Sequence, residues 1–233
     1  MSPVALKLAA RRLARQGRLT SPRRGFFVIV PLEYKSAGSP PPSWFIDQLM
    51  EFEREPYYVG LLSAAALHGA AHQQPQEFQV MASRQMRPAV VGRSRIRFLL
   101  KKHIKRTETI PVKTETGTMK ISTPESTALD LVRYPTHAGG LNNIATVLAD
   151  LAEKIDPKRL THAARRDDDL PSAQRIGFLL EHIGEEAKVK PLADLIDSMQ
   201  PRTVYLRSGR SPRPARKSAR WRVIINEDIE VPE

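Results

Sequence analysis

Basic side chains with a regular spacing open the chain. Lys7, Arg11 and Arg15 recur at every fourth residue, and Arg12 lies beside them. Residues four apart share one face of an α-helix, and the Ala/Leu/Arg-rich segment 4–16 favours a helix, so these side chains are expected on one surface. Guanidinium and ammonium groups gathered in this way bind phosphate, which makes a nucleic-acid backbone the expected ligand.

The residues around this basic face predict the elements that hold it. An apolar stripe should mark the inner side of the helix, formed by Leu6, Ala9, Ala10 and Leu13. Gly17 should end the helix, and a strand at 19–21, a turn at 22–25 and a strand at 26–30 should follow.

A basic helix followed by a ribbon with an arginine tip is typical of the end of a winged helix-turn-helix. The helix would lie in the major groove. The wing would reach phosphate or the minor groove through Arg18, Arg23 and Arg24. An ordinary amphipathic helix with a hairpin is the alternative interpretation.

The predicted motif is incomplete at its start. A winged helix normally has two helices before the recognition helix, and here the sequence opens with that helix. Leu8 also falls among the basic residues. The true start lies upstream, another chain completes the core, or this copy has lost DNA binding.

A second basic set follows a predicted strand. Arg93, Arg95 and Arg97 alternate with Ile96 and Phe98, which gives one basic face and one buried face. Lys101 and Lys102 come directly after. These five basic residues are predicted to form a second anionic contact, to more DNA or to another nucleic acid.

Charge is unevenly distributed along the chain, which carries 37 Lys and Arg, 25 Asp and Glu, and a formal net charge of +12. Windows 1–32, 78–107 and 198–226 contain no acidic residue and hold seven, nine and eight basic residues, which is 24 of the 37. Such blocks also occur as plain solvated surface. The separation of basic from acidic residues along the chain, however, creates strong local electrostatic potentials and favours a nucleic-acid partner.

The chain as a whole is predicted to be α+β, with a truncated N-terminal winged helix-turn-helix followed by a larger mixed domain. The Gly/Pro/Ser-rich segment 35–42 should link a DNA-binding domain at 1–34 to a second domain at 43–233. Helices are expected at 44–53, capped by Ser43, at 56–75, from Thr123 onward, at 139–156 and over 157–199. Strands are expected at 78–82, 109–113, 118–121, 203–207 and 221–225.

No catalytic or metal site is expected. His68 and His72 are four apart, but no Cys, Asp or Glu completes a ligand set nearby, so a structural role is favoured. Glu186-Ala187-Lys188, after the aspartates at 167–169, matches the acid-x-Lys of a restriction-endonuclease-like core but lies in a helical region. A metal-dependent nuclease is therefore the weaker alternative, and no cofactor is expected.

An RNA-binding module without DNA repression is a further alternative. It would use the 78–107 block with exposed aromatic side chains for base stacking, and only Phe98 and Phe78 are available there. The sequence has no cysteine and no run of about 18 apolar residues. These features suit a cytoplasmic protein without a membrane association.

In order along the chain, the motifs resemble those of AbiEi-type antitoxins from bacterial abortive-infection (type IV) toxin–antitoxin systems. The end of the winged helix is matched by RRLARQGRLTSPRRGFFVIVP, and the second domain by YYVGLLSAAALHGAAHQQP, ISTPESTALDLVRYP, AQRIGFLLEHIG and RWRVIINEDIEV. The resemblance extends along almost the whole chain, and the succession of motifs carries it.

This resemblance implies a transcriptional autorepressor that binds its own operator as double-stranded DNA. It also implies a larger C-terminal domain that counteracts a nucleotidyltransferase-like toxin, usually without a tight complex, as part of phage defence. The second basic set would then contact more DNA or the nucleic-acid substrate of this toxin. The incomplete helix-turn-helix concerns the expected autorepression and not the expected role of the C-terminal domain.

Overall fold

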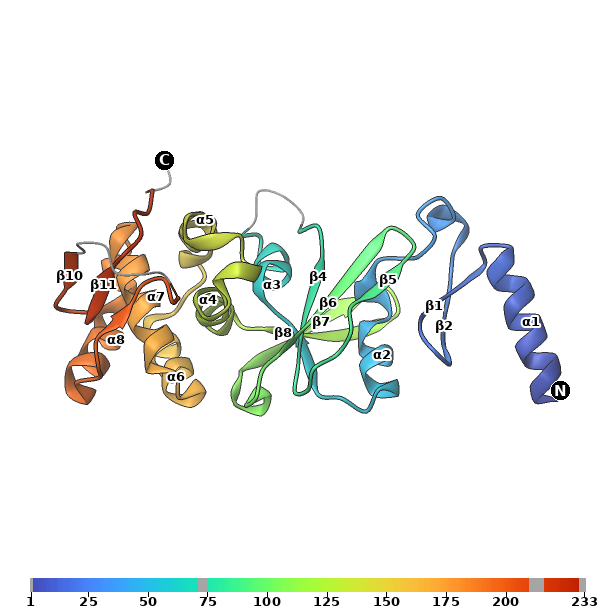
Figure 1. Ribbon diagram of the computed structural model, residues 1–233, viewed down its shortest axis with the longest axis horizontal. Coiled ribbons are helices and arrows are strands. Elements are labelled where there is room, and N and C mark those ends of the chain that lie inside the picture. The colour runs from blue at the N-terminus through green and yellow to red at the C-terminus, as the bar shows by residue number, and fades with distance from the viewer. Residues whose placement is uncertain (1, 71–74, 210–215, 231–233) are drawn as a thin grey trace. The chain divides into compact units, whose positions relative to one another are not determined.

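The computed structural model describes residues 2–70, 75–209 and 216–230, which form two compact α+β units (Figure 1). Unit 1 contains residues 2–59, 75–104 and 111–121. Unit 2 contains residues 60–70, 105–110, 122–209 and 216–230. No helix among the described residues is long and apolar enough to cross a membrane.

Unit 1 begins with a helix and a hairpin, as the sequence predicts. Helix α1 is Pro3–Arg15, and strands β1 (Leu19–Arg23) and β2 (Phe26–Ile29) form a two-stranded antiparallel sheet. Gly17 adopts a φ of +68°, a left-handed conformation that glycine accepts without strain.

A six-stranded mixed sheet forms the centre of unit 1. Its strand order is β5-β6-β4-β3-β8-β7. The strands are β3 (Tyr57–Val59), β4 (Phe78–Ala82), β5 (Ala89–Val91), β6 (Ser94–Leu100), β7 (Thr109–Thr114) and β8 (Gly117–Ser122). Helix α2 (Ile46–Phe52) packs Ile46, Leu49 and Met50 into the same apolar cluster as the buried residues of the sheet. The predicted strand at 78–82 and the hairpin around Gly117 are confirmed.

The predicted helix at 56–75 is wrong in its first part. Residues Tyr57–Val59 form β3, which pairs antiparallel with β4, and helix α3 is only Leu61–Leu67. A short run of fully buried apolar residues does not distinguish strand from helix by periodicity, and here the β-prone Tyr57, Tyr58 and Val59 pair with a neighbouring strand.

The segment predicted as a linker lies inside unit 1. The 3₁₀ turn Leu32–Tyr34 precedes it, the 3₁₀ turn Pro42–Trp44 begins at its last residue, and the amide of Arg93 donates to the carbonyl of Ala37 at 2.9 Å. A proline-rich segment can thus be ordered by hydrogen bonds with residues that are distant in the sequence of the same chain. Ser43 does not cap α2, whose N-cap is Phe45 with no side-chain hydrogen bond.

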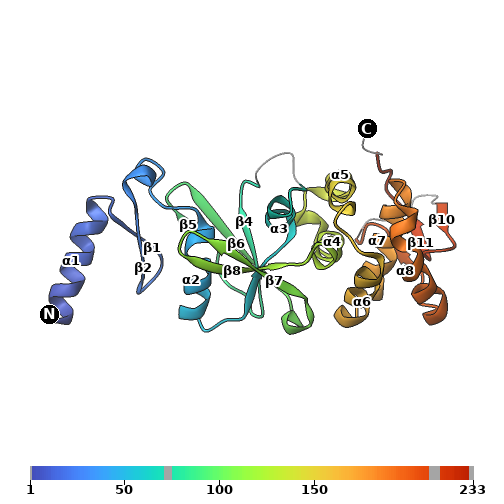
Figure 2. The ribbon, with the colours of Figure 1, turned by 180° about the vertical axis from the view of Figure 1, so that it is seen from behind.

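Unit 2 is mainly helical, and α6, α7 and α8 lie side by side in both views (Figures 1 and 2). Besides α3, its helices are α4 (Pro124–Arg133), α5 (Gly140–Ala152), α6 (Pro157–Asp167), α7 (Leu170–His182) and α8 (Glu186–Met199). A side chain with an oxygen acceptor starts three of them, namely Thr123, Asp156 and Asp169, each followed by proline in the first turn.

A small three-stranded sheet completes unit 2. Strand β11 (Val223–Ile225) pairs parallel with β9 (Val204–Tyr205) and antiparallel with β10 (Arg216–Ser218). The predicted pairing of the last two strand segments is therefore confirmed. Part of the basic loop between them, 210–215, lies outside the described residues, as does His72.

Candidate nucleic-acid interface

Helix α1 has the local signals that a stable helix needs at both ends. The Ser2 side chain accepts a hydrogen bond from the amide of Ala5 at 3.2 Å, and proline occupies the first turn. At the other end, Arg12 and Arg15 lie in the last turn, where positive charge stabilises the exposed carbonyl groups. The helix is about 20 Å long.

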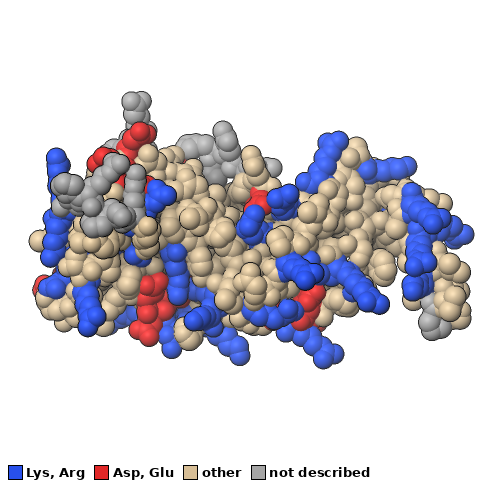
Figure 3. All heavy atoms as spheres, viewed as in Figure 1, with Lys and Arg blue, Asp and Glu red and all other residues tan. Residues whose placement is uncertain are grey.

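The basic residues of α1 are exposed and project from it without ion pairs. Lys7, Arg11, Arg12 and Arg15 are all exposed, and none of them contacts a carboxylate within 4.0 Å among the described residues. No Asp or Glu atom covers α1 in the space-filling view (Figure 3). No described carboxylate therefore neutralises these four charges, which is a condition for a surface that binds phosphate.

The apolar side of α1 differs from the prediction. Leu6 is 58% exposed, and Ala9, Ala10 and Leu13 are only partly buried. Leu8, at 59% exposure, lies among the basic residues as the sequence indicated. The stripe is therefore only partly covered by the described residues of this chain.

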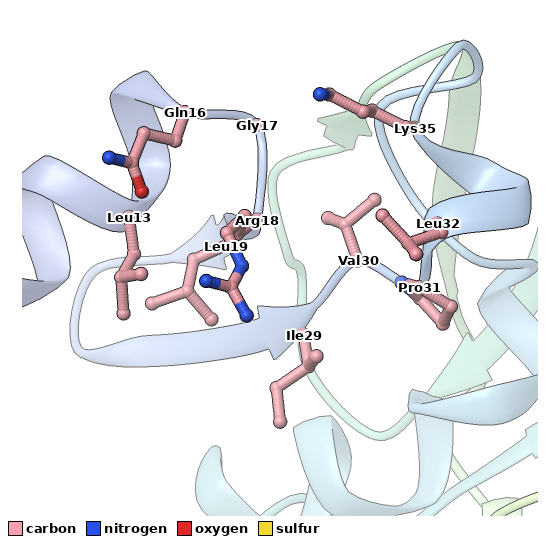
Figure 4. A pocket seen from close by; sticks show the side chains of 10 residues that line it. All are labelled: Leu13, Gln16, Gly17, Arg18, Leu19, Ile29, Val30, Pro31, Leu32 and Lys35. Carbon is pink, nitrogen blue, oxygen red and sulfur yellow. The ribbon is translucent and has the colours of Figure 1, made fainter.

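A hollow of about 870 Å³ lies at the carboxyl end of α1. Leu13, Leu19, Ile29 and Leu32 line it, together with Arg18 and five other residues (Figure 4). Ile29 and Leu32 are 74% and 85% exposed. This concentration of apolar side chains at the surface adjoins the basic face on the same unit.

A short antiparallel hairpin follows α1. Leu19 pairs with Ile29, and the Ser21 hydroxyl donates to the carbonyl of Phe26 at 2.8 Å, which tightens the tip. Arg18 and Arg24 are exposed and contact no carboxylate within 4.0 Å among the described residues.

Arg23 lies in a different environment from Arg18 and Arg24, because it is partly buried and contacts other residues of unit 1. Its Nε lies 3.6 Å from a carboxylate oxygen of Glu53, and its guanidinium donates to the carbonyls of Arg87 and Pro88. Its Cζ is also 5.2 Å from the ring centroid of Phe98. Burial lowers the pKa of Arg23, and Glu53 opposes this effect. These contacts tie the hairpin to the rest of unit 1 and leave little of Arg23 for a ligand.

The second predicted set divides into three environments. Arg95 and Arg97 lie on the same side of β6, and both contact Glu77. The Arg95 guanidinium donates to the Glu77 carboxylate at 3.5 Å. The Arg97 guanidinium donates to both oxygens of this carboxylate, one of them at 2.9 Å. The hydrogen bond from Arg97 lowers the pKa of Glu77 below its usual value. This pair of arginines is therefore partly neutralised.

Lys101 departs further from the prediction, because it is 1% exposed and its Nζ lies 5.9 Å from the ring centroid of Tyr58. A lysine buried in this way does not reach a surface anion. Arg93, in the turn before β6, and Lys102, after it, are exposed.

The partners of Arg23, Arg95 and Arg97 lie outside the acid-free windows, so a count within each window does not include them. Glu77 directly precedes the window 78–107, and Glu53 is 30 residues from Arg23 in sequence. The sequence does contain one signal, which is an acidic residue at the border of a basic window, such as Glu77. In the folded chain this residue can pair with basic residues inside the window.

The candidate metal and nuclease residues take structural positions. His68 is buried, its Nε2 donates to the carbonyl of Ser122 at 2.8 Å, and burial lowers its pKa. Glu186 begins α8, and the Lys188 ammonium donates to the carbonyl of Ile155 at 3.1 Å. The acid-x-Lys residues therefore lie on a helix and not on the strand that a restriction-endonuclease-like core requires.

Comparison with known proteins identifies the larger part of the chain. Residues 58–182 match the AbiEi antitoxin C-terminal domain, which is more than half of the 233 residues. The protein belongs to the AbiEi antitoxin family. Membership confirms the resemblance of the sequence motifs and supports an antitoxin role in a toxin–antitoxin system. AbiEi antitoxins are not an enzyme family, and an antitoxin implies a toxin as its partner.

The AbiEi match begins in β3 and ends with α7, so α1 and the hairpin lie outside it. The fold is also similar to the crystal structure of the RV2827C protein from Mycobacterium tuberculosis, with a TM-score of 0.67 and 15% sequence identity. The likeness covers 97% of this chain and 80% of that one, and at this identity it shows a shared fold alone. A comparison with curated proteins found no match.

Proposed function

We propose that this AbiEi family member is a DNA-binding antitoxin that represses its own operon. The observation that carries the proposal is the row of exposed basic side chains on α1, which contact no carboxylate of the described residues, followed by a hairpin with Arg18 and Arg24. Lys7, Arg11, Arg12 and Arg15 bind the walls of the major groove, and Arg18 and Arg24 contact phosphate beside it. Arg23 supports the hairpin and does not touch DNA.

The antitoxin function resides in the part of the chain that matches the family. In this proposal the toxin is nucleotidyltransferase-like and is counteracted in the cytoplasm, without a tight complex, as part of abortive infection. The motif resemblance supports this toxin class. Of the second basic set, Arg93 and Lys102 are the candidates for a further anionic contact, because they are exposed and Arg95 and Arg97 are bound to Glu77.

The DNA-binding half is tested with the double variant Arg11→Ala/Arg15→Ala. Alanine is at least as favourable in a helix as arginine, so α1 is retained. The dependence of operator affinity on salt should become flatter by about two units in log–log slope, because two phosphate contacts and their released counterions are lost. Fluorescence anisotropy of a labelled operator duplex across a salt series measures this slope.

A matched control removes two exposed lysines of the β7–β8 hairpin, Lys113→Ala/Lys120→Ala. It lowers the net charge equally, and its salt slope should equal that of the unmodified protein. An unchanged slope in the α1 variant, or equal losses in both variants, would reject docking of α1 on DNA.

The same α1 variant separates the two halves of the proposal. Protection of cells that express the toxin should persist in Arg11→Ala/Arg15→Ala, because the family domain at 58–182 is untouched. Loss of protection at normal protein level would assign the basic helix to neutralisation and contradict this division.

A further inference from the structure

Helix α6 in unit 2 carries a second basic face, outside both sets predicted from sequence. Its exposed positions are all basic or imidazole and include no acidic residue: Lys158, Arg159, His162, Arg165 and Arg166. Its inner side is buried, with Leu160, Ala163 and Ala164 packed inward. The helix is thus sharply divided between a core face and a cationic face.

Part of this face is held in place by nearby carboxylates. Arg166 lies 2.9 Å from Glu108, which also contacts His162 at 3.4 Å. Arg159 lies 4.0 Å from Glu125. Lys158 and Arg165 contact no carboxylate within 4.0 Å among the described residues, so their charges are available to a ligand.

The two available charges border one shallow hollow. Its volume is about 280 Å³, and it is lined by Lys158, Thr161, His162, Arg165, Pro191 and Asp194. Lys158 and Arg165 are seven residues apart, which places them about 10 Å apart along the helix axis. One strand of a nucleic-acid duplex presents about three phosphates over that length of axis.

The lining of this hollow indicates how a ligand is held. It contains cationic and hydrogen-bonding side chains and no Phe, Tyr or Trp ring on which a splayed base would stack. Contact with a continuous phosphodiester backbone, without sequence readout, fits these residue types. Asp194 also lines the hollow and would repel an anion beside it, which leaves Lys158 and Arg165 as the two residues that bind phosphate.

We propose that the cationic face of α6 is a second, sequence-independent binding surface for the phosphate backbone of a nucleic-acid duplex. It belongs to unit 2 and to the AbiEi-matched residues 58–182, and it does not depend on the role proposed for α1. The duplex is DNA or RNA, since the shared ligand is the backbone.

The test uses the full chain with the four charges of α1 removed by Lys7→Ala/Arg11→Ala/Arg12→Ala/Arg15→Ala, so that any remaining duplex binding reports other surfaces. In this background, Lys158→Ala/Arg165→Ala is compared with Arg202→Ala/Lys217→Ala. The control residues are also exposed, in unit 2 and without a carboxylate within 4.0 Å among the described residues. Random-sequence DNA and RNA duplexes are titrated separately by anisotropy at several salt concentrations.

The α6 change should weaken binding to at least one duplex about tenfold or more at 0.1 M salt and flatten its slope by about two units, while the control does neither. The duplex affected identifies the ligand. Absence of residual binding in the α1-neutral background, equal losses in the control, or unchanged binding to both duplexes would each overturn the proposal. Lost toxin protection with unchanged duplex binding would also overturn it, in favour of an acidic protein partner. The role proposed for α1 has its own test, which is the salt dependence of operator binding by Arg11→Ala/Arg15→Ala.

Discussion

Arg23 and Arg24 are adjacent arginines with opposite roles. Arg23 contacts Glu53, two backbone carbonyls and the ring of Phe98, whereas Arg24 is exposed and contacts no carboxylate within 4.0 Å among the described residues. Their residue type is identical, so their environments decide the function of each. A guanidinium that already donates to protein acceptors has few donors left for phosphate.

This difference predicts opposite effects of two single substitutions. Arg23→Ala should lower the free energy of unfolding by about 2 kcal/mol, because it removes charged hydrogen bonds and leaves carbonyl acceptors without their donor. Arg24→Ala should change stability by less than about 0.5 kcal/mol and weaken operator binding. Urea unfolding and anisotropy measure the two quantities.

Each variant is the control for the other. Full stability of Arg23→Ala would show that its contacts do not anchor the hairpin. Full operator affinity of Arg24→Ala would show that this arginine does not contact DNA.

The sequence indicated where basic residues gather but not which of them are free. Lys101 continues a basic run and yet is buried, and Arg95 and Arg97 alternate as predicted but meet Glu77. Pairing depends on residues that come together only in the folded chain, which a count along the sequence does not contain.

Individual elements were predicted best where local signals decide them. The start of α4 follows from Thr123, which caps the helix, and from Pro124 in its first turn. Residues 57–59 were assigned wrongly because their strand exists only through pairing with 78–82, which local propensity does not encode.

The contact between α7 and the loop before β11 provides a test of packing between elements. A Cβ added to Gly177 would lie 2.1 Å from the ring of Trp221, a buried side chain whose Nε1 donates to Glu181 at 2.8 Å. Gly177→Ala should therefore destabilise the protein by about 1–3 kcal/mol, even though alanine favours a helix by about 1 kcal/mol.

A double-mutant cycle isolates this clash. In a Trp221→Leu background the ring is absent, so adding Gly177→Ala should become neutral or stabilising, as measured by urea unfolding. An equal cost in both backgrounds would show that the contact with Trp221 is not the reason for the glycine.

At the scale of the whole molecule, segregated charge was the most informative feature of the sequence. It pointed to the exposed face of α1, and the order of motifs pointed to the AbiEi family, which the match over 58–182 confirms. The division into two units was not predictable, because each unit is assembled from segments that are separated along the chain.

The absence of cysteine from the sequence allows α1 to be tested directly by thiol cross-linking. At 100° per residue, Ala14 lies on the helix face of Lys7 and Arg11, and Ala9 lies on the opposite side. Ala14→Cys should cross-link to operator DNA that carries a tethered disulfide, and Ala9→Cys should not. Equal cross-linking by both cysteines, or none by Ala14→Cys with the protein bound to the duplex, would contradict the account.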